Sequence, residues 1–360
     1  MKKTLLLLCL VLCLVVAHGM TEETVESPVE QAKALITSGD AEGAVAVLEE
    51  AANMGDDAAQ AALGDCYAFG MGVEQDGQKA MEYYALSAEQ GYAPAQSMLG
   101  YGYLFGIDVE QDTDKALEYL QAAADQDEGT AQYYMGYCFE FGTGVEQDMP
   151  KALEYYKRSA DHGVDAAQYK LGVLYQLGQG VEQDYEKAFH YYSLAAEQDY
   201  PEALTAVGYF YGQGLGTEQN LDEMLKYYRL AVERGEPMAQ FNLGCCYRDG
   251  TGVEQDYGKM LEYFRLAVDQ GNANAQFNLG FAYYVGQGVE PDYDEAFRLY
   301  QLAADQGFPV AMFALGECYY GGNGVEKDWE KAGEWFQKAL DAGYEPDETD
   351  QVHMKEVFGE

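Results

Sequence analysis

The sequence predicts an all-α protein, a solenoid of helix-turn-helix repeats with a period of 36 residues, and three observations predict it. Glycine stands at residue 64 and at every thirty-sixth residue up to 316. A second glycine column runs from 70 to 322, and an alanine column runs from 59 to 311. Eight rows cover residues 57–344 without an insertion. A period of this length is typical of solenoids, whose units bury their apolar faces only against neighbouring units. Below, a repeat position is numbered by the first row, residues 57–92.

The N-terminus has the features of a secretory signal peptide, predicted at residues 1–19. Lys2 and Lys3 precede an apolar run over residues 5–17, and Ala17 and Gly19 are the small residues that a signal peptidase reads. This run of 13 residues is shorter than the roughly 18 to 20 needed to span a bilayer. We therefore expect a secreted or periplasmic protein without a transmembrane segment in the mature chain.

Residues 20–56 are predicted to form a degenerate N-terminal capping repeat. Ala44, Ala51 and Ala52 are in register with the second helix of a repeat, and a short turn at 38–40 joins them to a first helix near 24–37. At the other end, residues 345–360 are predicted to be a C-terminal cap or a tail. Val352, Val357 and Phe358 suit a helix that seals the last repeat, although the charges beside them are equally typical of a frayed end.

Each of the eight repeats is predicted to consist of two helices. Ala59, Leu63 and Tyr67 recur at helical spacing, and Ala80 and Tyr84 do so after a glycine-rich loop. Hydrogen-bond acceptors suited to capping the second helix stand at position 76: Asp76, Asp112, Asp148, Asp184, Asn220, Asp256, Asp292 and Asp328. The single change from aspartate to asparagine favours a capping role over a catalytic or binding role. Glycine at position 64, inside the first helix, predicts a close approach between helices.

These residues resemble the Sel-one-like repeat (SLR), a relative of the tetratricopeptide repeat. The motif reads Ala59-Gln60, Leu63-Gly64, Tyr67, Gly70-Met71-Gly72-Val73, Asp76, Lys79-Ala80, Tyr83-Tyr84, Ala88 and Gln90-Gly91, and it recurs over 288 of the 360 residues. The resemblance implies a right-handed α/α superhelix that acts as a scaffold or adaptor for other proteins.

The related tetratricopeptide geometry implies a concave face lined by the first helices at positions 58, 61, 65, 68 and 69. Fourteen of these forty positions are aromatic, and exposed aromatic patches are typical of binding surfaces. The predicted peptide-binding groove contains Tyr101, Phe105, Tyr133, Tyr137, Phe141, Tyr169, Tyr209, Phe241, Phe277, Phe281, Tyr284 and Phe313. The alternative is that tight curvature buries some of these rings as core.

The acidity of the chain restricts its partners. With 62 acidic against 21 basic residues and a formal charge of −41, the chain would repel nucleic acid and anionic lipid. Glutamate stands at position 74 and an acid at position 89 in all eight repeats. These acids suit recognition of a basic partner. They are equally explained by solubility, combined with duplication of one repeat that copied the same acids. They also leave open another function, that of an acidic cation-responsive protein.

Residues suited to catalysis or to metal binding are sparse. Cys66, Cys138, Cys246 and Cys318 share one apolar core position, two or more repeats apart, so we expect no disulfide among them. The resemblance also points to a cysteine-rich branch with β-lactamase-like members, and therefore to an alternative function as a cell-envelope accessory or weak hydrolase. Ala88 and Gln96 stand where that branch has its cysteine pair, and no Ser-x-x-Lys motif is present. We predict no metal and no cofactor.

Together these patterns predict an exported, noncatalytic scaffold that binds a protein or peptide partner through a concave aromatic groove. The oligomeric state does not follow from the sequence.

Overall fold

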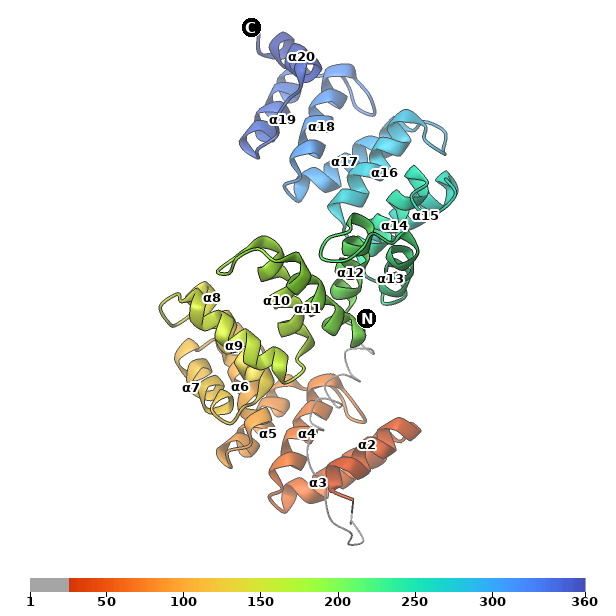
Figure 1. The fold of residues 1–360 in the computed structure, drawn as a ribbon. Helices are drawn as coiled ribbons and strands as arrows, with labels where there is room; N and C mark the ends of the chain where they lie inside the picture. The colour runs from red at the N-terminus through yellow and green to blue at the C-terminus, as the bar shows by residue number, and fades with distance from the viewer. Residues whose placement is uncertain (1–25, 360) are drawn as a thin grey trace. The chain divides into compact units, whose positions relative to one another are not determined.

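The computed structural model describes residues 26–359, and every regular element in this part of the chain is an α-helix. The predicted signal peptide, residues 1–19, lies outside the described residues. The helices follow one another in consecutive packed pairs, which confirms the predicted all-α solenoid (Figure 1). No helix within residues 26–359 is both long and apolar enough to cross a bilayer.

The chain forms two compact units that meet in sequence between Tyr200 and Pro201, and each is described by itself. The first unit contains α2 (Pro28–Ser38), α3 (Ala41–Asn53), α4 (Asp57–Phe69), α5 (Gly77–Glu89), α6 (Ala93–Phe105), α7 (Thr113–Ala124), α8 (Gly129–Phe141), α9 (Met149–Asp161), α10 (Asp165–Leu177) and α11 (Tyr185–Glu197). The second contains α12 (Pro201–Gln213), α13 (Leu221–Glu233), α14 (Pro237–Asp249), α15 (Tyr257–Asp269), α16 (Ala273–Val285), α17 (Tyr293–Asp305), α18 (Pro309–Gly321), α19 (Trp329–Asp341) and α20 (Glu348–Phe358).

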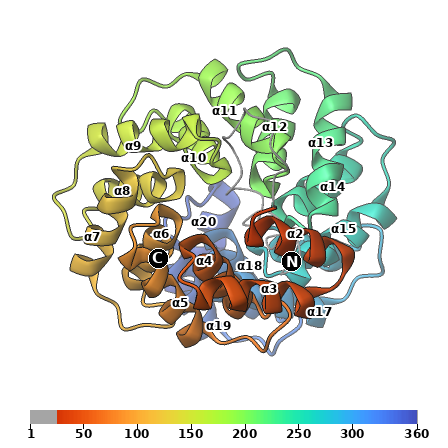
Figure 2. The same ribbon diagram turned by 90° about the horizontal axis from the view of Figure 1, so that it is seen from below.

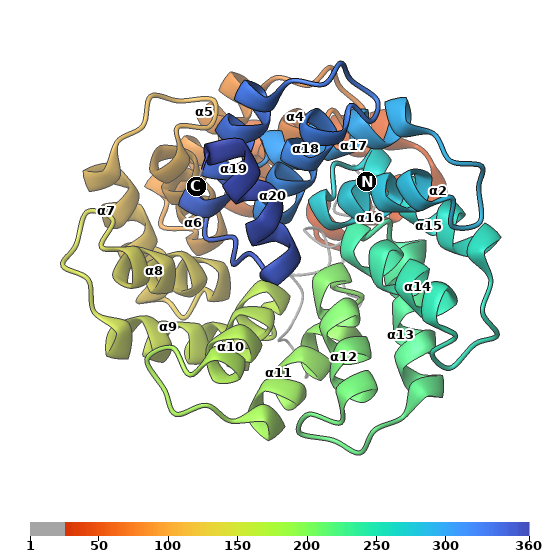
Figure 3. The same ribbon diagram turned by 90° about the horizontal axis from the view of Figure 1, so that it is seen from above.

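Within each unit the first helix of a repeat lies on the inner side and the second on the outer side. Figure 2 shows α4, α6, α8 and α10 inside α5, α7 and α9 in the first unit. Figure 3 shows α12 and α14 inside α13 and α15 in the second. We call the inward surface of the first helices the inner face of a unit.

The predicted helix caps at position 76 are confirmed. In all eight repeats the side-chain oxygen at this position accepts a hydrogen bond from the backbone N–H three residues later, at 3.0–3.1 Å. Asn220 does so like the seven aspartates, since capping needs only a short side-chain acceptor. Position 76 is therefore structural in every repeat.

The glycine at position 64 marks a close helix contact, as the sequence predicts. A β-carbon built on this glycine would lie 2.4–2.9 Å from the side chain at position 84 of the same repeat. That side chain is an aromatic ring in every repeat except one, where it is Leu120. The missing side chain therefore lets a large ring of the second helix lie directly on the backbone of the first.

Paired glutamines connect the two helices of most repeats. In five repeats the amide of Gln at position 90 donates to the buried Gln at position 60, at 2.7–2.9 Å. In the repeat 129–164 position 90 is His162, and Oε1 of the fully buried Gln132 has no hydrogen-bond partner. One repeat therefore lacks a bond that five others form.

Helix α20 has the position of the first helix of a further repeat. Its His353 stands 36 residues after Glu317 and contacts that carboxylate at 2.9 Å. Met354 is buried against a cluster that includes Phe313 and Phe336. Residues 348–358 thus pack as a helix on the last repeat rather than as a frayed end.

Candidate functional site

The aromatic residues predicted to line the groove divide into two sets. At position 61 each ring packs on the ring at position 84 of its own repeat, with centroids 5.0–5.6 Å apart. This set comprises Tyr133, Tyr169, Phe241, Phe277 and Phe313. Its rings belong to the contact between the two helices of a repeat, and four of them remain partly exposed, so their place in a groove stays a prediction. The alternative, that some rings are core, describes Phe313, the one buried member of this set.

Phe313 shows the burial of this set most clearly. It is only 7% exposed, because its ring stacks on both Phe336 and Tyr344. In the first unit, burial raises the pKa of the Tyr133 hydroxyl. The rings of this set help to hold the two helices of a repeat together, and Phe313 offers little surface to a ligand.

The second set, at positions 65 and 69, forms a continuous patch in the first unit. We call this patch the aromatic strip; it consists of Tyr101, Phe105, Tyr134, Tyr137 and Phe141. Its neighbouring ring centroids lie 4.7–6.0 Å apart, within the usual range for interacting aromatic pairs. Tyr134, at position 62, was not predicted, but it contacts Tyr101 and Phe105.

The strip is exposed where it reaches the ends of its helices. Phe105 is 41% exposed and Phe141 is 58% exposed, and Leu177 at the same position of α10 is 55% exposed. These three side chains succeed one another at the last residue of α6, α8 and α10. Because α6 and α8 contact each other directly, their rings form one surface rather than separate spots. A contiguous exposed apolar surface of this kind is typical of a binding site.

A buried ion pair lies beside the strip. Glu140 of α8 accepts a hydrogen bond from the Tyr156 hydroxyl at 2.7 Å and pairs with Lys170 of α10 at 2.7 Å. Lys170 also lies over the rings of Phe141 and Tyr156, 5.7 and 5.9 Å from their centroids. Burial raises the pKa of the Tyr156 hydroxyl, and the Glu140 carboxylate raises it further. The hydroxyl therefore stays protonated and remains a hydrogen-bond donor. The sequence did not reveal this pair, whose partners stand 30 residues apart.

In the second unit the equivalent positions are interrupted by polar residues. Tyr209 of α12 and Phe281 of α16 are exposed. Between them α14 carries Cys245, which is partly buried, and Arg248 and Asp249, which bond each other at 2.8 Å. Tyr284, also predicted for the groove, accepts a hydrogen bond from Asn323 at 2.8 Å and contacts two rings of α17. The predicted surface is therefore continuous only in the first unit.

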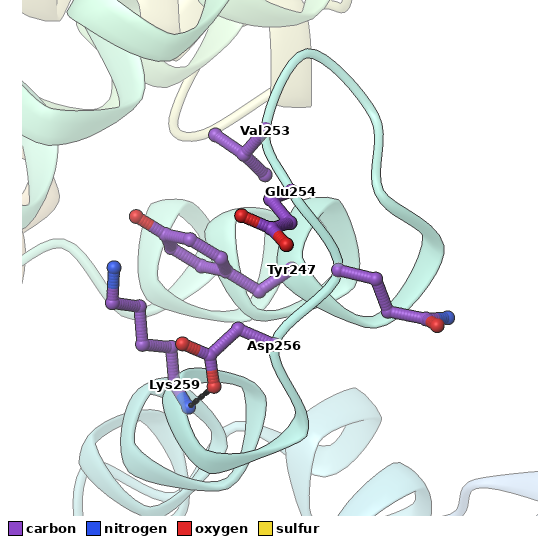
Figure 4. A pocket seen from close by; sticks show the side chains of 6 residues that line it. Tyr247, Val253, Glu254, Asp256 and Lys259 are labelled. Atoms are coloured by element: carbon purple, nitrogen blue, oxygen red, sulfur yellow. Dashed lines mark hydrogen bonds between the residues drawn. The ribbon is translucent and has the colours of Figure 1, made fainter.

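A shallow polar pocket lies beneath the loop of the repeat 237–272. Figure 4 shows its lining by Tyr247, Val253, Glu254, Asp256 and Lys259, which come from α14, the loop and α15. Asp256 is the helix cap, bonded to the backbone N–H of Lys259 at 3.0 Å. The Lys259 ammonium lies 4.8 Å from the centre of the Tyr247 ring. The same lysine-over-ring contact recurs at these positions in other repeats, so the pocket is part of the repeat architecture.

The cysteines lie in surroundings that disfavour nucleophilic chemistry. All five in the described part of the chain are free, and the four at position 66 are buried. Burial raises the pKa of Cys138 to about 11 and that of Cys246 to about 12, so neither forms a thiolate near neutral pH. Residues 26–359 hold no cluster of three His, Cys, Asp or Glu side chains suited to a metal ion.

Comparison with known proteins agrees with this repeat architecture. The Sel1 repeat model matches eight successive segments: 57–92, 93–128, 129–164, 165–200, 201–236, 237–272, 273–308 and 309–344. The chain belongs to the Sel1 repeat family. These eight segments are the 36-residue rows in which the glycine and alanine columns recur.

Two solved structures of Sel1 repeat proteins are similar to the chain over most of its length. A protective antigen of uropathogenic Escherichia coli with an SLR fold is 32% identical, with a TM-score of 0.66, over 88% of this chain and 67% of the antigen. A Sel1 repeat protein from Oxalobacter formigenes is 30% identical, with a TM-score of 0.62, over 97% of this chain and 99% of that one. No curated protein matches the chain at a significant level.

Proposed function

We propose that this Sel1 repeat protein is an exported, noncatalytic adaptor, and that the aromatic strip of its first unit binds a peptide segment of a partner protein. Repeat solenoids commonly act as protein-interaction scaffolds, because the first helices of successive repeats present one extended surface. The signal-peptide pattern of residues 1–19 supports export.

The observation that carries the proposal is the exposure of Phe105, Phe141 and Leu177 at one repeat position on three successive inner helices. In the repeat of Phe141 the ring at position 84, Tyr156, is already packed by Tyr133 at position 61. Large exposed rings at position 69 lose water contact only when another molecule covers them, and aromatic anchors of this kind dominate binding energies.

Charge indicates the composition of the bound segment. The chain has a formal charge of −41, so a segment rich in acids would be repelled at any part of its surface. A segment with apolar side chains spaced to reach successive rings, accompanied by lysine or arginine, complements both the strip and the charge.

A synthetic array of 12-residue peptides that combine leucine or phenylalanine with lysine or arginine tests the proposal. We expect some of these peptides to bind the wild-type protein, and the variant Phe105→Ala with Phe141→Ala to lose at least tenfold in affinity. The control is Leu86→Ala, since Leu86 is 48% exposed on the second helix α5. Equal binding by the wild type and the strip variant would overturn the proposal.

A further inference from the structure

Carboxylates at the inner-face positions 65, 68 and 69 are rare, and three of the four have a basic side chain as partner. Positions 65, 68 and 69 of the eight first helices hold four of them: Asp65, Glu140, Asp249 and Glu317. Glu140 pairs with Lys170 at 2.7 Å, Asp249 with Arg248 at 2.8 Å, and Glu317 with His353 at 2.9 Å. Among the described residues, Asp65 has no cation within ion-pair distance.

Asp65 lies in surroundings like those that hold a lysine two repeats later. The Tyr84 hydroxyl donates to its Oδ1 at 2.6 Å, as the Tyr156 hydroxyl donates to Glu140 at 2.7 Å. Phe69 and Tyr84 stand at the repeat positions of Phe141 and Tyr156, the two rings over which Lys170 lies. The α4–α5 repeat therefore has both rings of this arrangement and a carboxylate on the tyrosine hydroxyl, supplied from position 65 instead of position 68.

The missing component is the basic side chain that the following first helix supplies to Glu140 and to Glu317. Lys170 of α10 stands at the position that Met98 takes in α6, and His353 of α20 stands at the position that Tyr101 takes. Both equivalents in α6 are uncharged, and Tyr101 is itself the first residue of the aromatic strip. Tyr101 belongs to α6, whereas Asp65 belongs to α4. Asp65 and the strip therefore stand on neighbouring first helices of the same unit.

We propose that Asp65 receives the ammonium or guanidinium group of a lysine or arginine in the bound segment, while apolar side chains of that segment contact the aromatic strip. This inference rests on the proposed function and specifies the partner. Tyr84 orients the carboxylate through Oδ1, so Oδ2 is the oxygen that would receive the incoming cation. The rings of Phe69 and Tyr84 accommodate its alkyl stem as Phe141 and Tyr156 accommodate that of Lys170.

Burial of Asp65 agrees with this role. Desolvation raises its pKa to about 6, with the Tyr84 hydrogen bond acting in the opposite direction. A carboxylate held in this way gains a large benefit from an arriving cation, because the attraction is weakly screened there. A partner cation would thus bind most favourably above pH 6, where Asp65 is ionised.

Peptide pairs that differ at one side chain test the inference. Each pair has two leucines and one phenylalanine in a glycine-serine background, and lysine in one member is replaced by norleucine in the other, with this position scanned along the peptide. In at least one register we expect the lysine peptide to bind wild type about tenfold tighter than its norleucine partner. This ratio should fall to about 1 in Asp65→Asn and persist in Asp249→Asn, whose carboxylate already has Arg248.

The outcomes separate the two proposals. A lysine preference that persists in Asp65→Asn overturns the assignment of Asp65, while loss of binding in Phe105→Ala with Phe141→Ala still supports the strip. If no peptide binds the strip, the proposed function fails, and a titration with n-butylammonium chloride still decides on Asp65. We expect a saturable shift of the Asp65 carboxyl ¹³C signal, missing with n-butanol; no shift with either probe contradicts the inference.

Discussion

Gly77 provides the space that Asp108 occupies: a β-carbon on residue 77 would lie 2.0 Å from Cγ of Asp108. Position 72, in the loop between the two helices, is glycine in seven repeats and Asp108 in the other. Asp108 keeps the left-handed backbone of these glycines, with φ of 59°. In five other repeats the loop glycine lies close to a larger residue at position 77 of the preceding repeat, as Gly252 does to Leu221. The two exceptional residues of the chain therefore compensate for each other.

The pair predicts a strong coupling in a double-mutant cycle. Replacing a helix glycine by alanine usually stabilises a protein by about 0.5–1 kcal/mol. Gly77→Ala in the wild type should not show this gain in unfolding free energy, because the new methyl group displaces the Asp108 side chain. In an Asp108→Gly background the same change should stabilise, with a coupling of about 1 kcal/mol or more. Chemical denaturation of the four proteins measures it, with Gly258→Ala in α15 as the control. Additive effects would contradict the compensation.

Replacing His162 by glutamine should stabilise the protein. Five repeats have a glutamine at this position that donates to the buried glutamine at position 60, whereas Oε1 of Gln132 has no partner. Restoring the bond should raise the free energy of unfolding by about 1 kcal/mol. Gln132→Leu in the same background should then cost more than it does in the wild type. An unchanged or lower stability of His162→Gln would show that the orphaned oxygen is not the weak point.

Asp65 predicts a specific pH dependence of stability. Its pKa is raised by desolvation from 3.8 to about 6, so the folded state binds more protons than the unfolded state between these values. This contribution therefore stabilises at low pH and is lost as the pH rises from about 4 to about 6. Asp65→Asn, which keeps an acceptor for the Tyr84 hydroxyl, should exceed the wild type by on the order of 2 kcal/mol above pH 6.

The check is the difference in unfolding free energy between the two proteins at several pH values, since the difference removes the contribution of the other acids. The advantage of Asp65→Asn should shrink as the pH falls toward 4. A difference that stays constant with pH would mean that Asp65 titrates normally.

The repeated acids predict a salt response. Position 74 is glutamate and position 89 is Asp or Glu in all eight repeats, so like charges recur at equivalent edges of stacked units. Their repulsion is screened over roughly 8 to 10 Å at physiological salt. The melting temperature should rise by a few degrees between low and moderate sodium chloride. No change over this range, measured by circular dichroism, would contradict a net repulsion between these edges.

The sequence was sufficient for the features that one repeat determines locally. The acceptor at position 76 and the glycine at position 64 recur because each satisfies one backbone or packing requirement inside its own repeat. Their roles could be stated before the structure, since capping and close approach have specific residue preferences.

The inner surface was predicted less well, because helical periodicity does not separate positions 61 and 65. The two are four residues apart and share a helix face. Only the structure shows that Tyr133 contacts the position-84 ring of Tyr156 as well as Tyr134 of the strip, whereas Tyr137 contacts Phe105 and Phe141. Tyr134 lies at position 62, outside the face that the tetratricopeptide analogy implied, and the Glu140–Lys170 pair needs two helices of different repeats.

The measurement that tests the central claim most directly is the affinity of an array-selected basic, apolar peptide for the wild type, for Phe105→Ala with Phe141→Ala, and for Leu86→Ala. All three proteins should unfold at similar denaturant concentrations, since these side chains are exposed. We predict that the wild type and Leu86→Ala bind alike and that the strip variant binds at least tenfold more weakly. Equal affinity of all three proteins would contradict the claim that the aromatic strip is the binding surface.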